Sequence, residues 1–136
     1  MTQKKYRKVL AFGTFDHFHK GHEDFLRQAS LFGDSVIVVI ARDLTVEQVK
    51  GQKPEDSEKT RLSNVLKSSH VSSAVLGGHG DKYEVVRQID PDCICLGYDQ
   101  TAFTSQLSNE FPGITIKRLN PYQTHRYKSS YFRKKK

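Results

Sequence analysis

The chain has 136 residues, a length typical of one domain, and its hydrophobic content of 36% is enough for a single core. Two cysteines, Cys93 and Cys95, exclude a disulfide framework, and no apolar run approaches the ~18 residues of a membrane span. A cytoplasmic protein with no membrane insertion is therefore expected. The net charge of +7 depends on Arg133–Lys136, because without them eighteen cations face fifteen anions. We expect a domain over residues 1–132 and a basic tail over 133–136.

Short apolar runs alternate with amphipathic segments along the chain. In chain order they predict a strand at Val9–Phe12, a helix at Glu23–Phe32, a strand at Ser35–Ala41, a helix at Ser57–Lys67, a strand at Ser73–Leu76, a helix at Lys82–Ile89, a strand at Cys93–Leu96, a helix at Thr101–Phe111 and a strand at Ile114–Leu119. This order predicts an α/β fold, a doubly wound, Rossmann-like five-stranded parallel sheet with helices on both faces. Gly51–Pro54 is predicted to be a long connection and is a candidate lid.

The segment that directly follows the first predicted strand, Gly13–His22, carries three histidines and runs into a helix. In this fold class the ligand crevice lies beyond the carboxyl ends of the strands, where the strand order reverses. A helix N-terminus stabilises a phosphate through its unpaired N–H groups and its dipole. His19 and His22 can project to the same side of the helix. Gly13 and Gly21 let the backbone approach a ligand closely.

Other interpretations of these residues stay open. Each histidine on its own is compatible with a packed or surface side chain in a tight turn. His17, His19 and His22 also supply three imidazoles, as many protein ligands as a catalytic zinc site uses. Because His17 and His19 alternate in an extended loop they diverge, and we predict no metal bound by protein ligands. Cys93 and Cys95 lie two apart in a strand and are predicted to be small buried hydrophobes.

The segments GTFD at Gly13–Asp16 and HKGH at His19–His22 together resemble the signature of the cytidylyltransferase-like nucleotidyltransferases, which have the HxGH fold. Further blocks similar to the family follow in the same order: Arg42-Asp43, Lys50–Pro54, Arg61, Leu96–Gln100 and Lys128–Ser130. The resemblance covers most of the chain. It implies an enzyme that transfers a nucleoside monophosphate from an NTP, with Mg²⁺, to a phosphate monoester and releases pyrophosphate.

The resemblance also implies roles for individual residues. Catalytic phosphate contacts fall to His19, His22 and Lys50, with Lys50 or Lys53 closing over the site from the connection. Nucleotide binding falls to Gly13, Thr14, Phe15, Gly21, Asp99, Ser129 and Ser130. Acceptor binding falls to Asp16, Lys53 and Arg61. Structural alternatives stay open, with Asp16 holding the loop through backbone N–H groups, Arg61 on a solvated helix face, and Ser129 and Ser130 capping a helix.

Three features depart from the family pattern. His17 stands where family members often have an apolar residue. The arginine of the last motif is replaced by Thr124, which leaves Arg118 and Arg126 as candidates for that role. The spacing of Lys50 and Lys53 leaves open which lysine meets phosphate.

The LGYDQ block at Leu96–Gln100 resembles the archaeal-type FAD synthases more than the glycerol-3-phosphate enzymes, and so favours ATP and FMN as substrates. Aromatic candidates for the flavin pocket are Phe15, Phe18, Phe103, Tyr122 and Tyr127. One alternative is CTP with glycerol 3-phosphate or a similar small phosphate. Another is a non-catalytic basic module that binds a nucleotide or RNA, which the charge distribution disfavours. A homodimer is also open, since relatives are often dimers.

Overall fold

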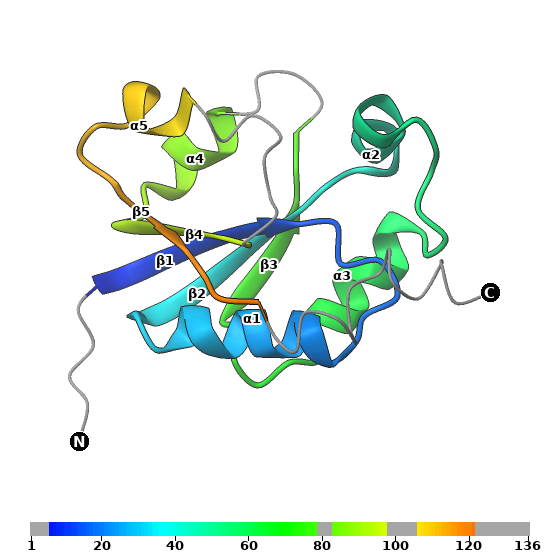
Figure 1. The fold of residues 1–136 in the computed structure, drawn as a ribbon, viewed down its shortest axis with the longest axis horizontal. Coiled ribbons are helices and arrows are strands. Elements are labelled where there is room, and N and C mark those ends of the chain that lie inside the picture. Colours follow the sequence, from blue (N-terminus) through cyan, green and yellow to red (C-terminus); the bar gives the residue numbers. More distant parts are fainter. Residues whose placement is uncertain (1–5, 79–82, 98–105, 122–136) are drawn as a thin grey trace.

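A computed structural model describes residues 6–78, 83–97 and 106–121 and places five parallel strands in one sheet. The elements in chain order are β1 Tyr6–Gly13, α1 Lys20–Ser30, β2 Gly33–Ile40, α2 Asp43–Lys50, α3 Glu58–Leu66, β3 Ser73–Leu76, α4 Glu84–Ile89, β4 Cys93–Leu96, α5 Leu107–Glu110 and β5 Thr115–Arg118. The strand order is β3-β2-β1-β4-β5 (Figure 1). It reverses between β1 and β4, so the expected crevice lies at the carboxyl ends of these two strands.

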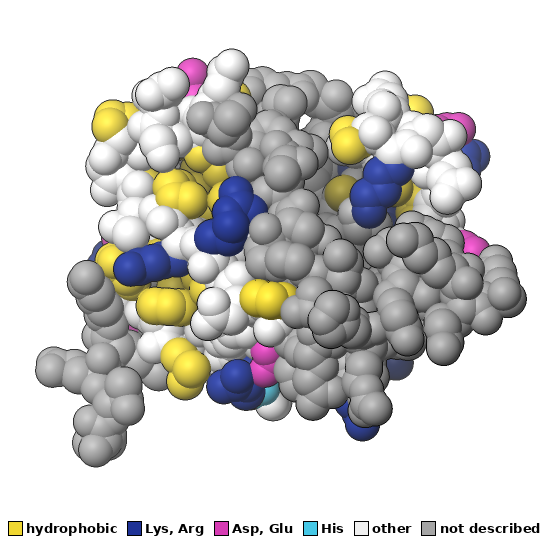
Figure 2. Space-filling model, in the orientation of Figure 1, with side chains coloured by type: hydrophobic (Ala, Val, Ile, Leu, Met, Phe, Trp, Pro, Cys, Tyr) yellow, Lys and Arg dark blue, Asp and Glu magenta, His cyan; other side chains and the backbone are white. Residues whose placement is uncertain are grey.

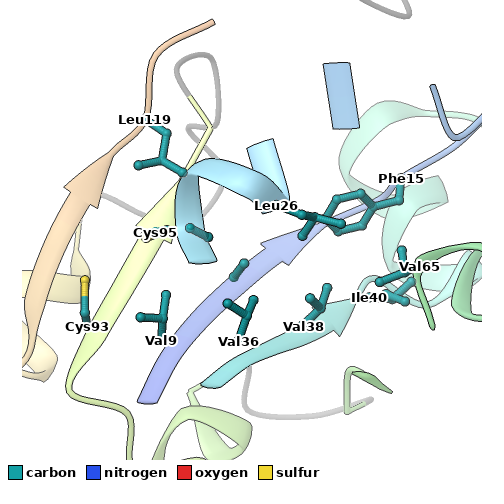
Figure 3. Packing of buried hydrophobic residues seen from close by; sticks show 12 residues of the cluster. Val9, Phe15, Leu26, Val36, Val38, Ile40, Val65, Cys93, Cys95 and Leu119 are labelled. Atoms are coloured by element: carbon teal, nitrogen blue, oxygen red, sulfur yellow. The ribbon is translucent and has the colours of Figure 1, made fainter. Parts of the chain in front are cut away.

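Helices cover both faces of the sheet, as Figure 1 shows, and each face has its own hydrophobic cluster. On one face α1 and α3 bury Leu26, Ala29 and Val65 against the strands, as in Figure 3. On the other face α4 and α5 bury Val86 and Leu107. Because its central strands are covered on both sides, β2 is apolar at every position from Val36 to Ile40. The predicted fold class is confirmed.

One helix was missed in the sequence. Asp43–Lys50 forms α2, where no regular element was predicted, because only Val46 of this helix is buried and its apolar pattern is correspondingly weak. Lys50 is therefore the last residue of a helix, and the prediction that places it in a flexible connection is wrong. α2 ends at Gly51, whose φ of 85° is left-handed, as is common for a residue after a helix.

The remaining boundaries differ little from the prediction. The exception is Thr101–Phe111, of which the described part forms the short α5, while residues 101–105 lie outside the described segments. Cys93 and Cys95 are both fully buried in the cluster that Figure 3 shows, which confirms that they are core residues. No helix in the described segments is long and apolar enough to cross a membrane.

Candidate active site

The HxGH segment forms the start of α1 and caps it with its own two imidazoles. His19 is the N-cap residue, and its Nδ1 accepts a hydrogen bond from the backbone N–H of Gly21 at 3.0 Å. His22 is three residues further on, and its Nδ1 accepts from the backbone N–H of His19 at 3.2 Å. This is the reciprocal arrangement of a capping box, with imidazole nitrogens in the place of the usual oxygens. The two rings stack with centroids 3.9 Å apart, so the prediction that they share one side is confirmed.

These caps fix which nitrogen of each ring carries a hydrogen. A nitrogen that accepts a hydrogen bond bears no proton, so a neutral His19 or His22 must carry its hydrogen on Nε2. Protonation would put a hydrogen on Nδ1, where it would face a backbone N–H and break the cap. The start of α1 therefore favours two neutral imidazoles, each with Nε2–H as its donor.

The environment of the two imidazole rings also favours their neutral forms. Burial, followed by the neighbouring imidazole of His19, lowers the pKa of His22 to about 3. The ring centroids of Phe15 and Phe18 lie 5.4 and 5.5 Å from the ring centroid of His22. Burial and the charge of His17 also lower the pKa of His19. Both histidines of the pair are therefore neutral at pH 7 in the absence of a ligand.

The loop between β1 and α1 contains two residues with left-handed backbone, Phe15 with φ of 57° and His17 with φ of 51°. The ring of Phe15 turns back into the core and is 4% exposed (Figure 3). Gly13 makes room for it, because a Cβ there would lie 2.6 Å from the ring. The expected ligand-lining role of Phe15 is thus limited to its backbone, and Gly13 is needed for packing inside the protein.

Asp16 and His17 join this loop to the connection between α2 and α3. The Asp16 carboxylate accepts from the backbone N–H groups of Glu55 and Asp56 at 2.9 and 2.8 Å. Burial alone would raise the pKa of Asp16, but these two hydrogen bonds, together with the charges of His17 and Arg61, lower it. The imidazole Nε2 of His17 lies 2.7 Å from the carboxylate of Glu55. These contacts agree with the structural alternative for Asp16, in which its carboxylate binds backbone N–H groups.

Arg61 of α3 is completely buried, so its interpretation as part of a solvated helix face is wrong. Its guanidinium donates to acceptors in three segments: the carbonyls of Asp56 at 3.1 Å and Thr14 at 2.8 Å, and the Asp43 carboxylate at 2.7 Å. The planar guanidinium can span three partners at once, which a lysine ammonium does less well. Arg61 therefore ties the loop after β1 to the start of α2 and to the connection before α3.

The start of α2 contains contacts that the sequence did not reveal. The Glu58 carboxylate accepts from the backbone N–H of Asp43 at 2.8 Å and lies 3.2 Å from Arg42. The hydrogen bond from Asp43 is the main reason why the pKa of Glu58 is lowered. Glu58 thus caps a helix in which Arg42, the N-cap residue, makes no capping bond with its side chain. The sequence does single out the Arg42-Asp43 block, but nothing in it shows that Glu58, fifteen residues after Asp43, is the partner of this block.

The two candidate lysines lie in different surroundings. The charge of Lys50 is one of the causes of the lowered pKa of His22, which places the ammonium within electrostatic reach of the imidazole pair. Lys53 lines a hollow of about 480 Å³ between α2 and α3, together with residues of both signs, Asp43 and Lys59 among them. Of the two, Lys50 is the lysine whose charge contributes to the lowered pKa of His22.

Several predicted residues lie outside the described segments: Asp99, Arg126, Ser129 and Ser130, together with Phe103, Tyr122 and Tyr127. Arg118 is described, and its guanidinium donates to the carbonyl of Gly97 at 2.7 Å. It therefore contacts the residue after β4, beside the expected crevice. Within residues 6–78, 83–97 and 106–121, no cluster of three histidine, cysteine or acidic side chains could hold a metal ion.

The parallel sheet, with its strand order reversing between β1 and β4 next to the HxGH segment, is the fold of a nucleotide-binding α/β protein. Among protein families, the cytidylyltransferase-like family model matches residues 10–135 of the chain. The chain belongs to the cytidylyltransferase-like family, and it is a nucleotidyltransferase.

Similar curated proteins cover between three quarters and nearly all of the chain. A protein named FAD synthase from Thermoplasma volcanium is 37% identical over 132 residues, covering 94% of this chain and 92% of its own. A protein of the same name from Methanosarcina mazei is 46% identical over 103 residues, covering 76% and 67%.

Solved structures agree on the fold. The structure of a lipopolysaccharide core biosynthesis protein from Thermoplasma volcanium GSS1 superimposes with a TM-score of 0.80 at 34% identity, covering 86% of this chain and 98% of the other. A bifunctional NMN adenylyltransferase/ADP ribose pyrophosphatase from Francisella tularensis has a TM-score of 0.59 at 17% identity, covering 96% of this chain and 41% of the other. At that identity the second likeness supports the fold alone.

Proposed function

We propose that this protein is an FMN adenylyltransferase, an enzyme that transfers AMP from ATP to the phosphate of FMN and releases pyrophosphate. The observation that carries the proposal is the agreement of two facts. Curated relatives named FAD synthase are 37–46% identical to this chain. The described site presents a neutral imidazole pair at a helix N-terminus beside the strand-order reversal.

The proposed chemistry needs donors around the phosphate oxygens rather than a nucleophilic side chain. The FMN phosphate attacks the α-phosphorus of ATP, one P–O bond forms, and the bond to the leaving pyrophosphate breaks. In this scheme His19 and His22 donate from Nε2–H to oxygens whose negative charge grows in the transition state. Lys50 supplies the positive charge beside them. The N–H groups at the start of α1 and the helix dipole add to the same field.

The remaining roles extend this scheme to the substrates. ATP enters as its Mg²⁺ complex, with the ion held by the triphosphate. Thr14, Gly21 and the backbone of Gly13 and Phe15 bind the nucleotide, together with Asp99, Ser129 and Ser130. Lys53 stays a proposed acceptor contact, whereas we now place Asp16 and Arg61 behind the site, where they hold the segments that touch the acceptor. The cytoplasm is the proposed location, and a homodimer is the proposed assembly that solution scattering can test.

The two alternatives stated for the sequence are weaker. CTP with glycerol 3-phosphate keeps the same phosphate chemistry, but the curated relatives from Thermoplasma volcanium and Methanosarcina mazei carry the FAD synthase name. An RNA-binding module needs a concentrated basic surface. On the face in Figure 2, the Lys and Arg side chains of the described residues are spread among uncharged and acidic ones.

Product analysis tests the proposal directly. The protein is incubated with Mg²⁺ and either ATP or CTP, each with FMN and with glycerol 3-phosphate, and the products are separated by mass. We expect FAD from ATP and FMN, and no product when Mg²⁺ is removed by a chelator. A CDP-linked product formed at a higher rate would replace the proposal by its first alternative. Pyrophosphate release from no pair, with intact nucleotide or RNA binding, would support the second.

A further inference from the structure

His17 makes contacts that the phosphate chemistry does not require. It precedes the imidazole pair, and its backbone N–H donates to the Asp56 carboxylate at 3.2 Å. Its own Nε2 lies 2.7 Å from the Glu55 carboxylate. Asp16 binds the backbone N–H groups of the same two residues. Side chains of each segment therefore reach the other segment, and four contacts join residues 16–17 to residues 55–56.

The backbone of this loop is arranged for these contacts. Phe15 and His17 both have positive φ values, which non-glycine residues adopt only where the surroundings compensate. Phe15 is held by the core. His17 is half-exposed and has no such packing, so its contacts with Glu55 and Asp56 are what the described structure offers in compensation.

The segment that is held in this way includes one candidate lysine and directly follows the other. Residues 51–57 begin after Lys50, include Lys53 and lead into α3. Arg61 holds the same segment from the protein interior through the carbonyl of Asp56. His17 holds it from the outside, on the side of the exposed loop.

We propose that His17 is a positioning residue of the transfer reaction: its contact with Glu55 fastens residues 51–57 to the loop after β1 and so sets where Lys50 and Lys53 lie relative to His19 and His22. The role rests on the proposed function, since it serves that reaction. His17 touches neither substrate in this scheme and acts through the connection.

Exposure makes the role separable from folding. The side chains of His17 and Glu55 are 48% and 62% exposed. Surface contacts this exposed contribute little to stability, whether or not they are ion pairs. A change in this contact is therefore expected to alter the reaction much more than the melting temperature, whereas a purely structural residue would alter both or neither.

The test compares four variants and the double variant with the wild-type protein. His17→Leu and Glu55→Ala each remove the contact. The double variant lacks both side chains but loses the same single contact. His17→Gln keeps an N–H donor that can reach Glu55. His70→Leu is the matched control, because His70 lies 3.8 Å from Glu23 and joins neither of the two segments. FAD formation gives kcat and KM. Hydrogen exchange of the backbone amides of residues 51–57 shows, without any substrate, how firmly this segment is held.

We expect His17→Leu and Glu55→Ala to lower kcat by about tenfold, well below the ~100-fold that an ångström-scale misplacement costs. The KM for FMN changes little, and the double variant is no worse than either single variant. Exchange of residues 51–57 becomes faster, while the melting temperature stays within about 3 °C. His17→Gln recovers most of the loss, and His70→Leu resembles the wild type.

Unchanged kcat and unchanged hydrogen exchange in His17→Leu would overturn the proposal. So would a loss of kcat in the double variant that equals the product of the losses in the two single variants. A loss of kcat that follows a loss of melting temperature would assign His17 to folding instead. Failure of the proposed function is visible separately, because the wild-type protein then forms no FAD. In that case the same variant ratios are measured on pyrophosphate release with CTP and glycerol 3-phosphate, and absence of any wild-type reaction overturns the positioning role as well.

Discussion

The starts of α1 and α2 lie at the same edge of the sheet but are held in different ways. At α1, the capping groups are within the helix itself, since His19 and His22 bond to backbone N–H groups no more than three residues away. At α2, the groups come from a distant part of the chain, where Glu58 accepts from the backbone of Asp43. The first helix also buries Leu26 and Ala29 against the sheet, whereas α2 buries only Val46.

This difference distinguishes two parts of the candidate site. We call the start of α1, with His19 and His22, the fixed part, and α2, which ends at Lys50, the attached part. The imidazoles are oriented by local geometry and by rings packed around them, so their donors are in place before a ligand arrives. Lys50 is at the far end of a helix that is attached mainly through its first turn. The position of the lysine depends therefore on long-range contacts, and substitutions at the two helices are expected to have different consequences.

The largest expected effect is on the fixed part. His22→Ala removes one Nε2–H donor and is expected to lower kcat by about 10²–10³-fold, the usual cost of losing one donor to transition-state charge. FAD formation under saturating ATP and FMN measures it. His22→Glu is the matched variant, because glutamate at this position can keep the cap to His19 but has no N–H donor when ionised. We expect it to retain the melting temperature but not the activity, and full activity in His22→Glu would show that the cap alone matters.

The next effect concerns the contacts that join the two parts. Arg61→Met leaves the Asp43 carboxylate and the carbonyls of Thr14 and Asp56 without their buried partner, and is expected to cost about 3 kcal/mol of unfolding free energy. Urea denaturation measures it. Arg27→Met is the control, because the Arg27 side chain in its pair with Asp24 is half-exposed and the loss costs roughly 0.5 kcal/mol or less. Equal losses in the two variants would contradict the joining role of Arg61.

Acidification gives a third test of the fixed part. The pKa of His22 is lowered to about 3 in the folded protein, so between pH ~6.5 and 3 the unfolded chain binds the extra proton. Unfolding free energy therefore falls as the pH falls through this window, by up to about 1.4 kcal/mol per pH unit from this group. His19 acts in the same direction. Denaturation between pH 6.5 and 4.5 should show a smaller slope in His22→Gln, and equal slopes would contradict the neutral pair.

Sequence reasoning reached the fixed part and missed much of the attached part, for one physical reason. Strands such as Cys93–Leu96 and the amphipathic α1 follow from local periodicity, and the position of the HxGH segment follows from local motifs. The buried contacts of Arg61 depend on a partner 47 residues away, which no local pattern displays. The same holds for the contact between His17 and Glu55.

The missed helix has a related cause. α2 buries one side chain, so its apolar periodicity is weak, and its cap is supplied by Glu58 instead of a residue at its own start. The exposed Leu44 and Val49 further blur the pattern, since they are apolar without being in the core. Where tertiary contacts rather than local pattern hold an element, the sequence alone gives little sign of it.

The smallest effect is at the end of α2 and isolates backbone conformation from packing. Gly51 has a φ of 85°, and a Cβ added there would meet no atom of the described residues within 4 Å. Gly51→Ala is therefore expected to cost only the strain of a left-handed alanine, about 1 kcal/mol in urea denaturation. Gly113→Ala is the matched control, because its Cβ also meets no atom of the described part of the chain within 4 Å and its φ lies outside the left-handed range. We expect that control to be neutral or slightly stabilising, since alanine restricts the unfolded chain. Equal effects of the two substitutions would show that α2 does not need the left-handed residue to end at Lys50.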